Sequence, residues 1–147
     1  MALALRRPEL LLSSAALALL LALSDAHVSA SAQNAQVSLV RQDFSDCTNS
    51  NVSDKDPSLI GGQAWVVRNP DGTTSVKIAM TVKADTTYHF FLKCVRLLGD
   101  IKTDDEGVGE ASFNFQTDSV GTVFAFDMYP EGAPPGNKYQ SVQVNLR

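Results

Sequence analysis

The chain is poor in the residues that catalysis and metal binding use most. Its 147 residues include two histidines, two cysteines and one tryptophan, and His89 is the only histidine after residue 32. A serine hydrolase needs a base beside its nucleophile, and a copper or zinc centre on a β-sandwich needs several histidines. No Gly-x-Ser-x-Gly sequence occurs either. The sequence therefore predicts a protein that is not an enzyme and that carries no cofactor.

Concentrated positive charge is also missing. Removing Arg6, Arg7, Glu9 and Asp25 from the totals of 12 basic and 16 acidic residues leaves 10 and 14 beyond residue 32, a net charge of −4. The remaining basic residues are scattered singly. A nucleic-acid-binding surface needs a basic patch or stripe, and a protein needs a similar cluster of basic residues to bind an anionic membrane. We therefore expect no nucleic-acid partner.

The longest apolar run lies at the amino terminus and has the layout of a secretory signal peptide. Arg6 and Arg7 form a short basic segment, and an apolar run centred on residues 15–23 follows. Small residues come next, and residues 28–32 contain two overlapping cleavage sites of the small-x-small kind. We predict that residues 1–32 are a signal helix that is removed on export.

A retained membrane anchor is the alternative interpretation of this run. Ser13 and Ser14 interrupt it and Asp25 ends it, so it is shorter than the ~20 apolar residues that a spanning helix needs. Cleavage is therefore favoured, and the protein is predicted to be secreted or periplasmic. The mature part, residues 33–147, has the length of one domain and contains no predicted membrane span.

The predicted export decides how the two cysteines are interpreted. An even number of cysteines in an exported chain predicts a disulfide between Cys47 and Cys94, with two free thiols as the alternative. Cys94 continues the alternation of Tyr88, Phe90 and Leu92, so we expect its side chain to face the core. Cys47 lies in a long polar loop, residues 43–59, which a bridge would tie onto the sheet. That loop also holds an N-glycosylation triplet at Asn51, which matters only in a eukaryotic secretory pathway.

Apolar and polar residues alternate along most of the mature chain. Such alternation is typical of half-buried antiparallel strands, and no segment after the signal shows helical periodicity. The turn sequence at 69–72, Asn-Pro-Asp-Gly, predicts a hairpin between its flanking strands. We count seven or eight short strands and predict an all-β fold, a single antiparallel β-sandwich. The segments are residues 35–42, 64–68, 74–83, 87–101, 111–116, 122–128 and 139–146.

The same alternation assigns most aromatic residues to the core. The predicted core set is Trp65 with Phe90, Phe113, Phe115, Phe124 and Phe126. Phe91 falls out of phase and shares the opposite face with His89 and Lys93. We expect Phe91 to pack under a second apolar layer, with an exposed partner surface as the alternative.

Three patterns in these strands and turns are similar to those of a known group of domains. They are Tyr88-x-x-Phe-Leu-x-Cys, Gly99-Asp-Ile-x-Thr-Asp-x-x-Gly-x-Gly-x-Ala-x-Phe and Tyr139-x-Ser-x-x-Val. Together they resemble small secreted bacterial domains that have an immunoglobulin-like sandwich and no assigned activity. The resemblance covers most of the mature chain and implies an immunoglobulin-like fold in an extracytoplasmic setting. It implies no mechanism.

Acidic residues gather between residues 100 and 110, around two glycines. Oxygen-rich clusters of this kind bind calcium, but the spacing here differs from that of an EF-hand loop. Aspartate and glycine are also typical of hairpin turns. We therefore predict a solvated turn, with a calcium or acid–base site as the alternative. The residues of that alternative site are Asp100, Asp104, Asp105 and Glu106, with Glu110 nearby.

A loop rich in proline and glycine, residues 129–138, precedes the last predicted strand. Sandwich domains carry recognition on the loops at the ends of their strands, and prolines reduce the entropy lost on binding. We predict Tyr129, Glu131, Lys138 and Tyr139 as candidate binding residues, with a plain crossover as the alternative.

The sequence as a whole predicts a non-enzymatic, exported β-sandwich module. Its predicted role is to bind a protein or glycan through its end loops, or to support a cell-envelope assembly. The alternative is a small exported calcium-binding protein or enzyme that uses the acidic turn at 100–110.

Overall fold

The fold consists of antiparallel strands joined by turns and two short 3-10 helices. A computed structural model describes residues 33–133 and 138–146. The predicted signal helix, residues 1–32, lies outside this range. No helix in the described ranges is long and apolar enough to cross a membrane. The elements are β1 (Gln33–Val40), η1 (Pro57–Leu59), β2 (Ile60–Arg68), β3 (Thr73–Thr81), β4 (Thr87–Leu92), β5 (Arg96–Lys102), β6 (Val108–Gln116), η2 (Thr117–Ser119), β7 (Val123–Phe124), β8 (Phe126–Tyr129), β9 (Tyr139–Ser141) and β10 (Val144–Asn145).

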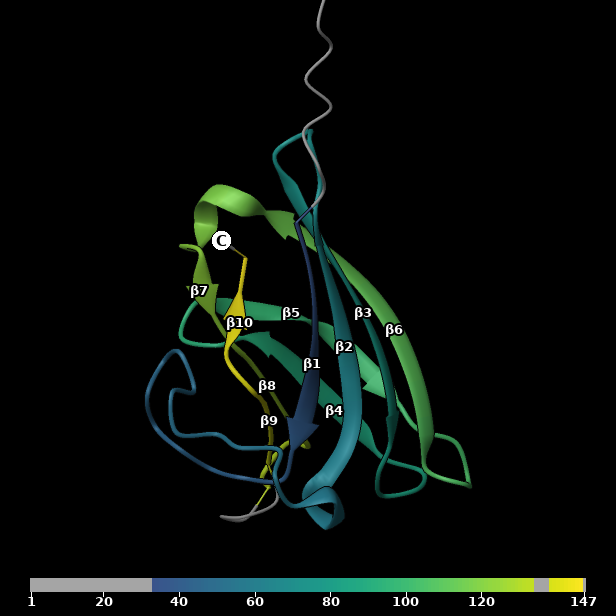
Figure 1. Cartoon of the computed structure of the whole chain (residues 1–147). Coiled ribbons are helices and arrows are strands. Elements are labelled where there is room, and N and C mark those ends of the chain that lie inside the picture. The colour runs from purple at the N-terminus through teal and green to yellow at the C-terminus, as the bar shows by residue number, and fades with distance from the viewer. Residues whose placement is uncertain (1–32, 134–137, 147) are drawn as a thin grey trace, which may run out of the picture.

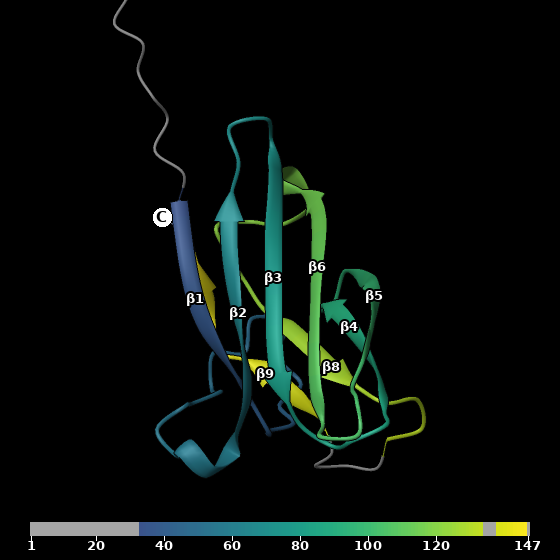
Figure 2. The same cartoon turned by 90° about the vertical axis from the view of Figure 1, so that its right-hand side faces the viewer.

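Eight of these strands form one sheet that folds over on itself. The strand order is β5-β4-β8-β9-β1-β2-β3-β6, while β10 and β7 form a separate antiparallel pair. In Figure 2, β1, β2, β3 and β6 lie side by side, and β8 and β9 cross behind them. The two edge strands approach each other, because a Cβ at Gly99 of β5 would lie 2.4 Å from the Phe113 ring of β6. The predicted all-β antiparallel fold is confirmed, in a sandwich that is nearly a closed barrel (Figure 1).

The core lies between the two halves of the folded sheet. Most of the longer strands contribute every second residue to it, and outside β2 these are the residues that the alternation predicted. Five aromatic rings form a contiguous group, with Phe126 stacked on Phe90 at 5.1 Å and in edge contact with Phe115 and Phe124, and with Phe113 stacked on Phe90 at 5.6 Å. The main core residues are Val37, Leu39, Ala64, Val66, Val76, Ile78, Met80, Tyr88, Phe90, Leu92, Ile101, Phe115, Phe124, Phe126, Met128, Val144 and Leu146.

The predicted hairpin at 69–72 is confirmed, and a second hairpin was missed. Residues 87–101 are two antiparallel strands, β4 and β5, rather than one continuous segment. A tight turn separates them, closed by a hydrogen bond from the Val95 amide to the Leu92 carbonyl at 2.9 Å. Cys94 occupies this turn with a φ of 59°. Because the turn contains neither glycine nor proline, the sequence carries no local signal for it.

Two further predicted strands are each divided in the structure. Residues 122–128 become β7 and β8, separated at Ala125, and residues 139–146 become β9 and β10. The divisions occur where the chain leaves the large sheet to form the β7–β10 pair. The described chain therefore has ten strands rather than seven or eight.

The prediction that Trp65 belongs to the core is wrong. Its neighbours Ala64 and Val66 are the buried residues of β2, and the Trp65 side chain lies on the outer face with 37% of its surface exposed. Ala64 pairs with Ile78 of β3, and Val66 pairs with Val76, so the inward register of β2 is set by these contacts. The alternation of Trp65 with Val67 suggested the opposite register, but the pairing with a strongly apolar neighbour decides it.

Candidate functional site

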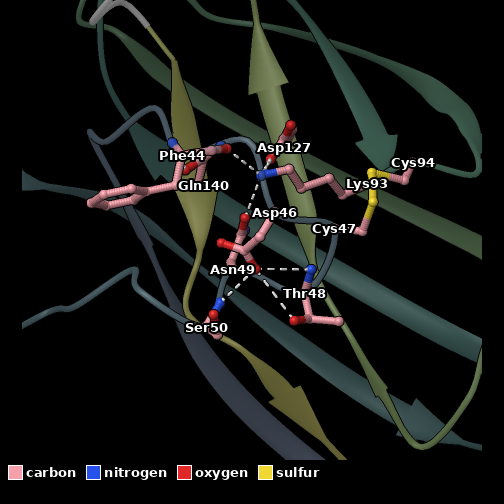
Figure 3. Close-up of a disulfide and its surroundings, with 10 residues drawn as sticks. All are labelled: Phe44, Asp46, Cys47, Thr48, Asn49, Ser50, Lys93, Cys94, Asp127 and Gln140. Carbon is pink, nitrogen blue, oxygen red and sulfur yellow. Dashed lines mark hydrogen bonds and ion pairs between the residues drawn. A yellow bond between two sulfur atoms is a disulfide. The ribbon is translucent and has the colours of Figure 1, made fainter.

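The predicted disulfide is present and ties the loop after β1 to the β4–β5 turn (Figure 3). The Cα atoms of Cys47 and Cys94 are 5.5 Å apart, within the range that a disulfide allows. The expected inward orientation of Cys94 is wrong, because β4 ends at Leu92 and the half-cystine is exposed on the turn. The bridge therefore lies at the surface and does not cross the core.

Lys93 points inward, in the orientation that the sequence analysis predicted for Cys94. Only 9% of Lys93 is exposed. Its ammonium group donates to the Phe44 carbonyl at 2.6 Å and to the side-chain oxygen of Asn49, and it lies 3.7 Å from the Asp127 carboxylate (Figure 3). A buried ammonium is stable only when it is paired and hydrogen-bonded. The polar loop supplies Phe44 and Asn49, and β8 supplies Asp127.

Asn49 is the second anchor of this loop and is fully buried. Its side-chain amide donates to the Ser141 carbonyl at 2.9 Å and to the Phe126 carbonyl at 3.3 Å. Its φ of 52° lies in the left-handed region, which asparagine tolerates better than most residues. The sequence contains no signal that separates Asn49 from the other polar residues of the loop, so this anchor was missed.

Asp127 is the acidic member of the same network. One carboxylate oxygen is buried and accepts no hydrogen bond from the described residues. Burial raises the pKa of Asp127 above its ordinary value of 3.8, and the nearby Lys93 charge offsets part of that shift. A carboxylate with a raised pKa suits a functional group, but Lys93 gives it a structural partner within the fold.

The raised pKa leads to a test of this network by pH. A carboxyl group whose pKa is higher in the folded protein stabilises the fold most when it is protonated. The stabilising contribution of Asp127 is therefore complete at a pH below its ordinary pKa of 3.8. It is lost as the pH rises through the higher pKa of the folded protein. Urea unfolding from about pH 4 to about pH 7 should show the wild type losing stability relative to Asp127→Asn. Parallel stability curves for the two proteins would contradict this origin of the pH dependence.

The acidic segment at 100–110 forms a turn between β5 and β6, and its members are dispersed. Asp100 lies within β5, where its carboxylate is 2.7 Å from the Nδ1 atom of His89. Asp104 accepts hydrogen bonds from the Glu106 and Val108 amides at 3.0 and 2.8 Å, while Asp105 and Glu106 are exposed. Within the described ranges, no three acidic, histidine or cysteine side chains are arranged to hold a metal ion. These contacts favour the structural turn.

Substitutions in the acidic turn should separate its structural residue from its solvated ones. Replacing Asp105 and Glu106 with Asn and Gln should change the free energy of unfolding by less than ~0.5 kcal/mol, as at other surface positions. Asp104→Ala should cost about 1 kcal/mol, because two turn amides lose their acceptor. Chemical denaturation measures both effects. A calcium-dependent rise in melting temperature that the Asp105 and Glu106 replacements abolish would instead indicate a metal site.

The candidate loop residues are divided between two faces. The Tyr129 ring stacks on Phe91 with centroids 5.0 Å apart, and the Lys138 ammonium lies 5.1 Å from the Tyr129 ring centroid. Tyr139 instead points to the core, where its ring lies edge-on to the Tyr88 ring with centroids 6.3 Å apart. Glu131 is exposed, and residues 134–137 lie outside the described range. Phe91 is therefore packed on the outer face, and the binding role of the loop stays a prediction.

The outer face of β1, β2, β3 and β6 presents a different kind of surface. Three rows of paired residues cross these four strands, and the middle row contains Trp65 at its second position. We call these twelve residues the Trp65 face; Figure 2 shows the four strands that carry it. The rows are Asn34, Val67, Ser75 and Asn114; Gln36, Trp65, Lys77 and Ser112; and Ser38, Gln63, Ala79 and Glu110.

A groove of about 340 Å³ runs beside the indole on this face. Its lining includes Gly62 and Ala79, with Gln63, Thr81 and Val108 around it. Gly62 allows the two strands to pack closely, because a Cβ there would lie 2.6 Å from the Ala79 carbonyl oxygen. The groove therefore has small residues beside a large exposed aromatic ring. Its volume falls in the range of ligand-binding sites.

Other hollows on the described surface are less suited to a ligand. A hollow of about 510 Å³ lies beside Arg68 and η2, but its described lining residues include no aromatic side chain. A hollow of about 260 Å³ lies beside Phe91 and Tyr129, whose rings stack on each other. In contrast, Trp65 makes no ring–ring contact with a described aromatic residue.

Comparison with known proteins adds no assignment. No protein family model matches the chain, and no curated protein sequence matches it significantly. The function is therefore inferred from the geometry of the surface.

Proposed function

We propose that the protein is an exported, non-catalytic module that binds a partner molecule outside the cytoplasm through the Trp65 face. The observation that carries this proposal is the exposed indole of Trp65 in the middle of a sheet face whose other residues, apart from Val67, are small or polar. An exposed tryptophan gives up contact with the core, whereas a buried one would stabilise the fold. At binding surfaces, tryptophan is the side chain most enriched among the residues that contribute most affinity.

Export is the second part of the proposal. The disulfide supports it, because disulfides persist in oxidising compartments and are rare in the cytosol. The sequence of a basic segment, an apolar run and small residues before Gln33 supports a cleaved signal. The immunoglobulin-like relationship inferred from the sequence is compatible with an antiparallel sandwich and belongs to the same proposal.

The proposed surface is tested by binding to the cell envelope of the producing organism. Trp65→Ala should weaken co-sedimentation with isolated envelopes by at least ~10-fold, as expected for a central aromatic residue of a binding site. Leu97→Ala is the matched control, because Leu97 is also a large exposed apolar residue but lies on β5 at the other edge of the sheet. Melting curves verify that both variants fold. Equal loss in the two variants, or no loss in Trp65→Ala, would contradict the proposal.

A further inference from the structure

We infer that the molecule bound by the Trp65 face is an uncharged polysaccharide, lying across strands β1, β2, β3 and β6. This inference rests on the proposed function and names the ligand class of the same surface. The chemistry of the twelve outward residues carries it, beginning with their charge.

The Trp65 face carries little positive charge. Its charged members are Lys77 and Glu110, one of each sign, in neighbouring rows on neighbouring strands, and at its border the Asp54 carboxylate accepts a hydrogen bond from Ser38 at 3.0 Å. Nucleic acids and acidic polysaccharides are bound by several cations that act together. A single lysine with a glutamate close by offers no such field, so the face complements an uncharged ligand.

The polar members of the face suit the hydroxyl groups of sugars. Amide and hydroxyl side chains can both donate and accept hydrogen bonds, as sugar hydroxyls do. Gln36 donates from Nε2 to the Oε1 atom of Gln63, which orients one amide relative to the other beside the indole. The face holds four amide residues and three serines: Asn34, Gln36, Gln63, Asn114, Ser38, Ser75 and Ser112.

The apolar members suit the other side of a sugar ring. A pyranose has an apolar face of C–H groups and a rim of hydroxyls, so it needs a flat apolar surface bordered by hydrogen-bonding groups. The Trp65 indole supplies the apolar surface, and the small residues Gly62 and Ala79 line the adjoining groove. Gln63 and Thr81 border that groove with polar groups.

The arrangement of the rows favours a polymer over a single sugar. Gln36, Trp65, Lys77 and Ser112 come from four adjacent strands. Neighbouring strands lie about 4.8 Å apart, so the row spans roughly 14 Å. That length allows contacts with more than one sugar unit of a chain.

Affinity electrophoresis in gels that contain defined polysaccharides tests the ligand class. The neutral probes are hydroxyethylcellulose, xylan, galactomannan and dextran, and the anionic probes are polygalacturonate and alginate. We expect at least one neutral polymer to retard the wild type and Leu97→Ala, and to leave Trp65→Ala at its mobility in an empty gel. The retardation should persist at high salt, because an uncharged polymer forms no ion pair with the face that salt would screen.

Each contrary result has a distinct meaning. Retardation by the anionic polymers alone, or retardation that high salt removes, would overturn the uncharged ligand. No retardation by any neutral polymer would also overturn it, and a protein partner would then be indicated if Trp65-dependent binding to envelopes remains. If binding to envelopes does not depend on Trp65, the proposed function itself is overturned, whatever the gels show.

Discussion

Replacing Cys47 and Cys94 together with alanine is expected to lower the free energy of unfolding by about 2–5 kcal/mol. The bridge closes a segment with a sequence separation of 47 residues. In the chain-entropy model, a loop of that size restricts the unfolded chain by roughly 4 kcal/mol. The two half-cystines are exposed, so their replacement leaves no core cavity and the entropic effect dominates.

The measurement is urea unfolding of the wild type and the double variant under non-reducing conditions. Mass spectrometry of the unreduced wild type should show the two half-cystines joined to each other. Free alkylation of both thiols without reductant would contradict the pairing. A variant as stable as the wild type would show that the loop is held by its other contacts alone.

Asn49→Ala is expected to cost about 3 kcal/mol or more. The change leaves the Ser141 and Phe126 carbonyls without their side-chain donor and removes a partner of the buried Lys93 ammonium. Each buried polar group that loses its partner costs about 1–3 kcal/mol, and a charged group costs more. Alanine also tolerates the left-handed backbone at this position less well than asparagine.

Two further variants separate these causes. Asn49→Gly accepts the positive φ but lacks the side chain, so it should lose slightly less stability than Asn49→Ala. Asn51→Ala is the matched control two residues later, where the side chain is exposed and the change should stay within ~0.5 kcal/mol. Chemical denaturation of the three variants gives the comparison. Similar losses at positions 49 and 51 would contradict the anchoring role of Asn49.

The strands were predictable from the sequence because alternation with a period of two survives in most of them. Val76, Ile78 and Met80 of β3 show it, and the hairpin before them carries a clear turn sequence. The β4–β5 turn was not predictable in the same way. Its left-handed residue is Cys94, and the disulfide to Cys47 and the hydrogen bonds of Lys93 to Phe44 and Asn49 hold this turn against the loop after β1.

The candidate site was harder to predict for a related reason. Alternation with Val67 placed Trp65 in the core, and only the pairing of Ala64 and Val66 with β3 reverses that assignment. The register of a strand depends on its neighbours, which one sequence does not identify. Asn49 was missed because its contacts come from Lys93, Phe126 and Ser141, all more than 40 residues away along the chain.

The fluorescence of Trp65 tests the central claim most directly. The chain contains one tryptophan, so its intrinsic fluorescence reports on the proposed binding face alone. Acrylamide should quench the free protein efficiently, because the indole is partly exposed. Saturation with a retarding neutral polysaccharide, which has no tryptophan of its own, should reduce the quenching and shift the emission to shorter wavelength. Unchanged quenching and emission at saturation would show that binding occurs elsewhere on the molecule and would contradict the assignment of the Trp65 face.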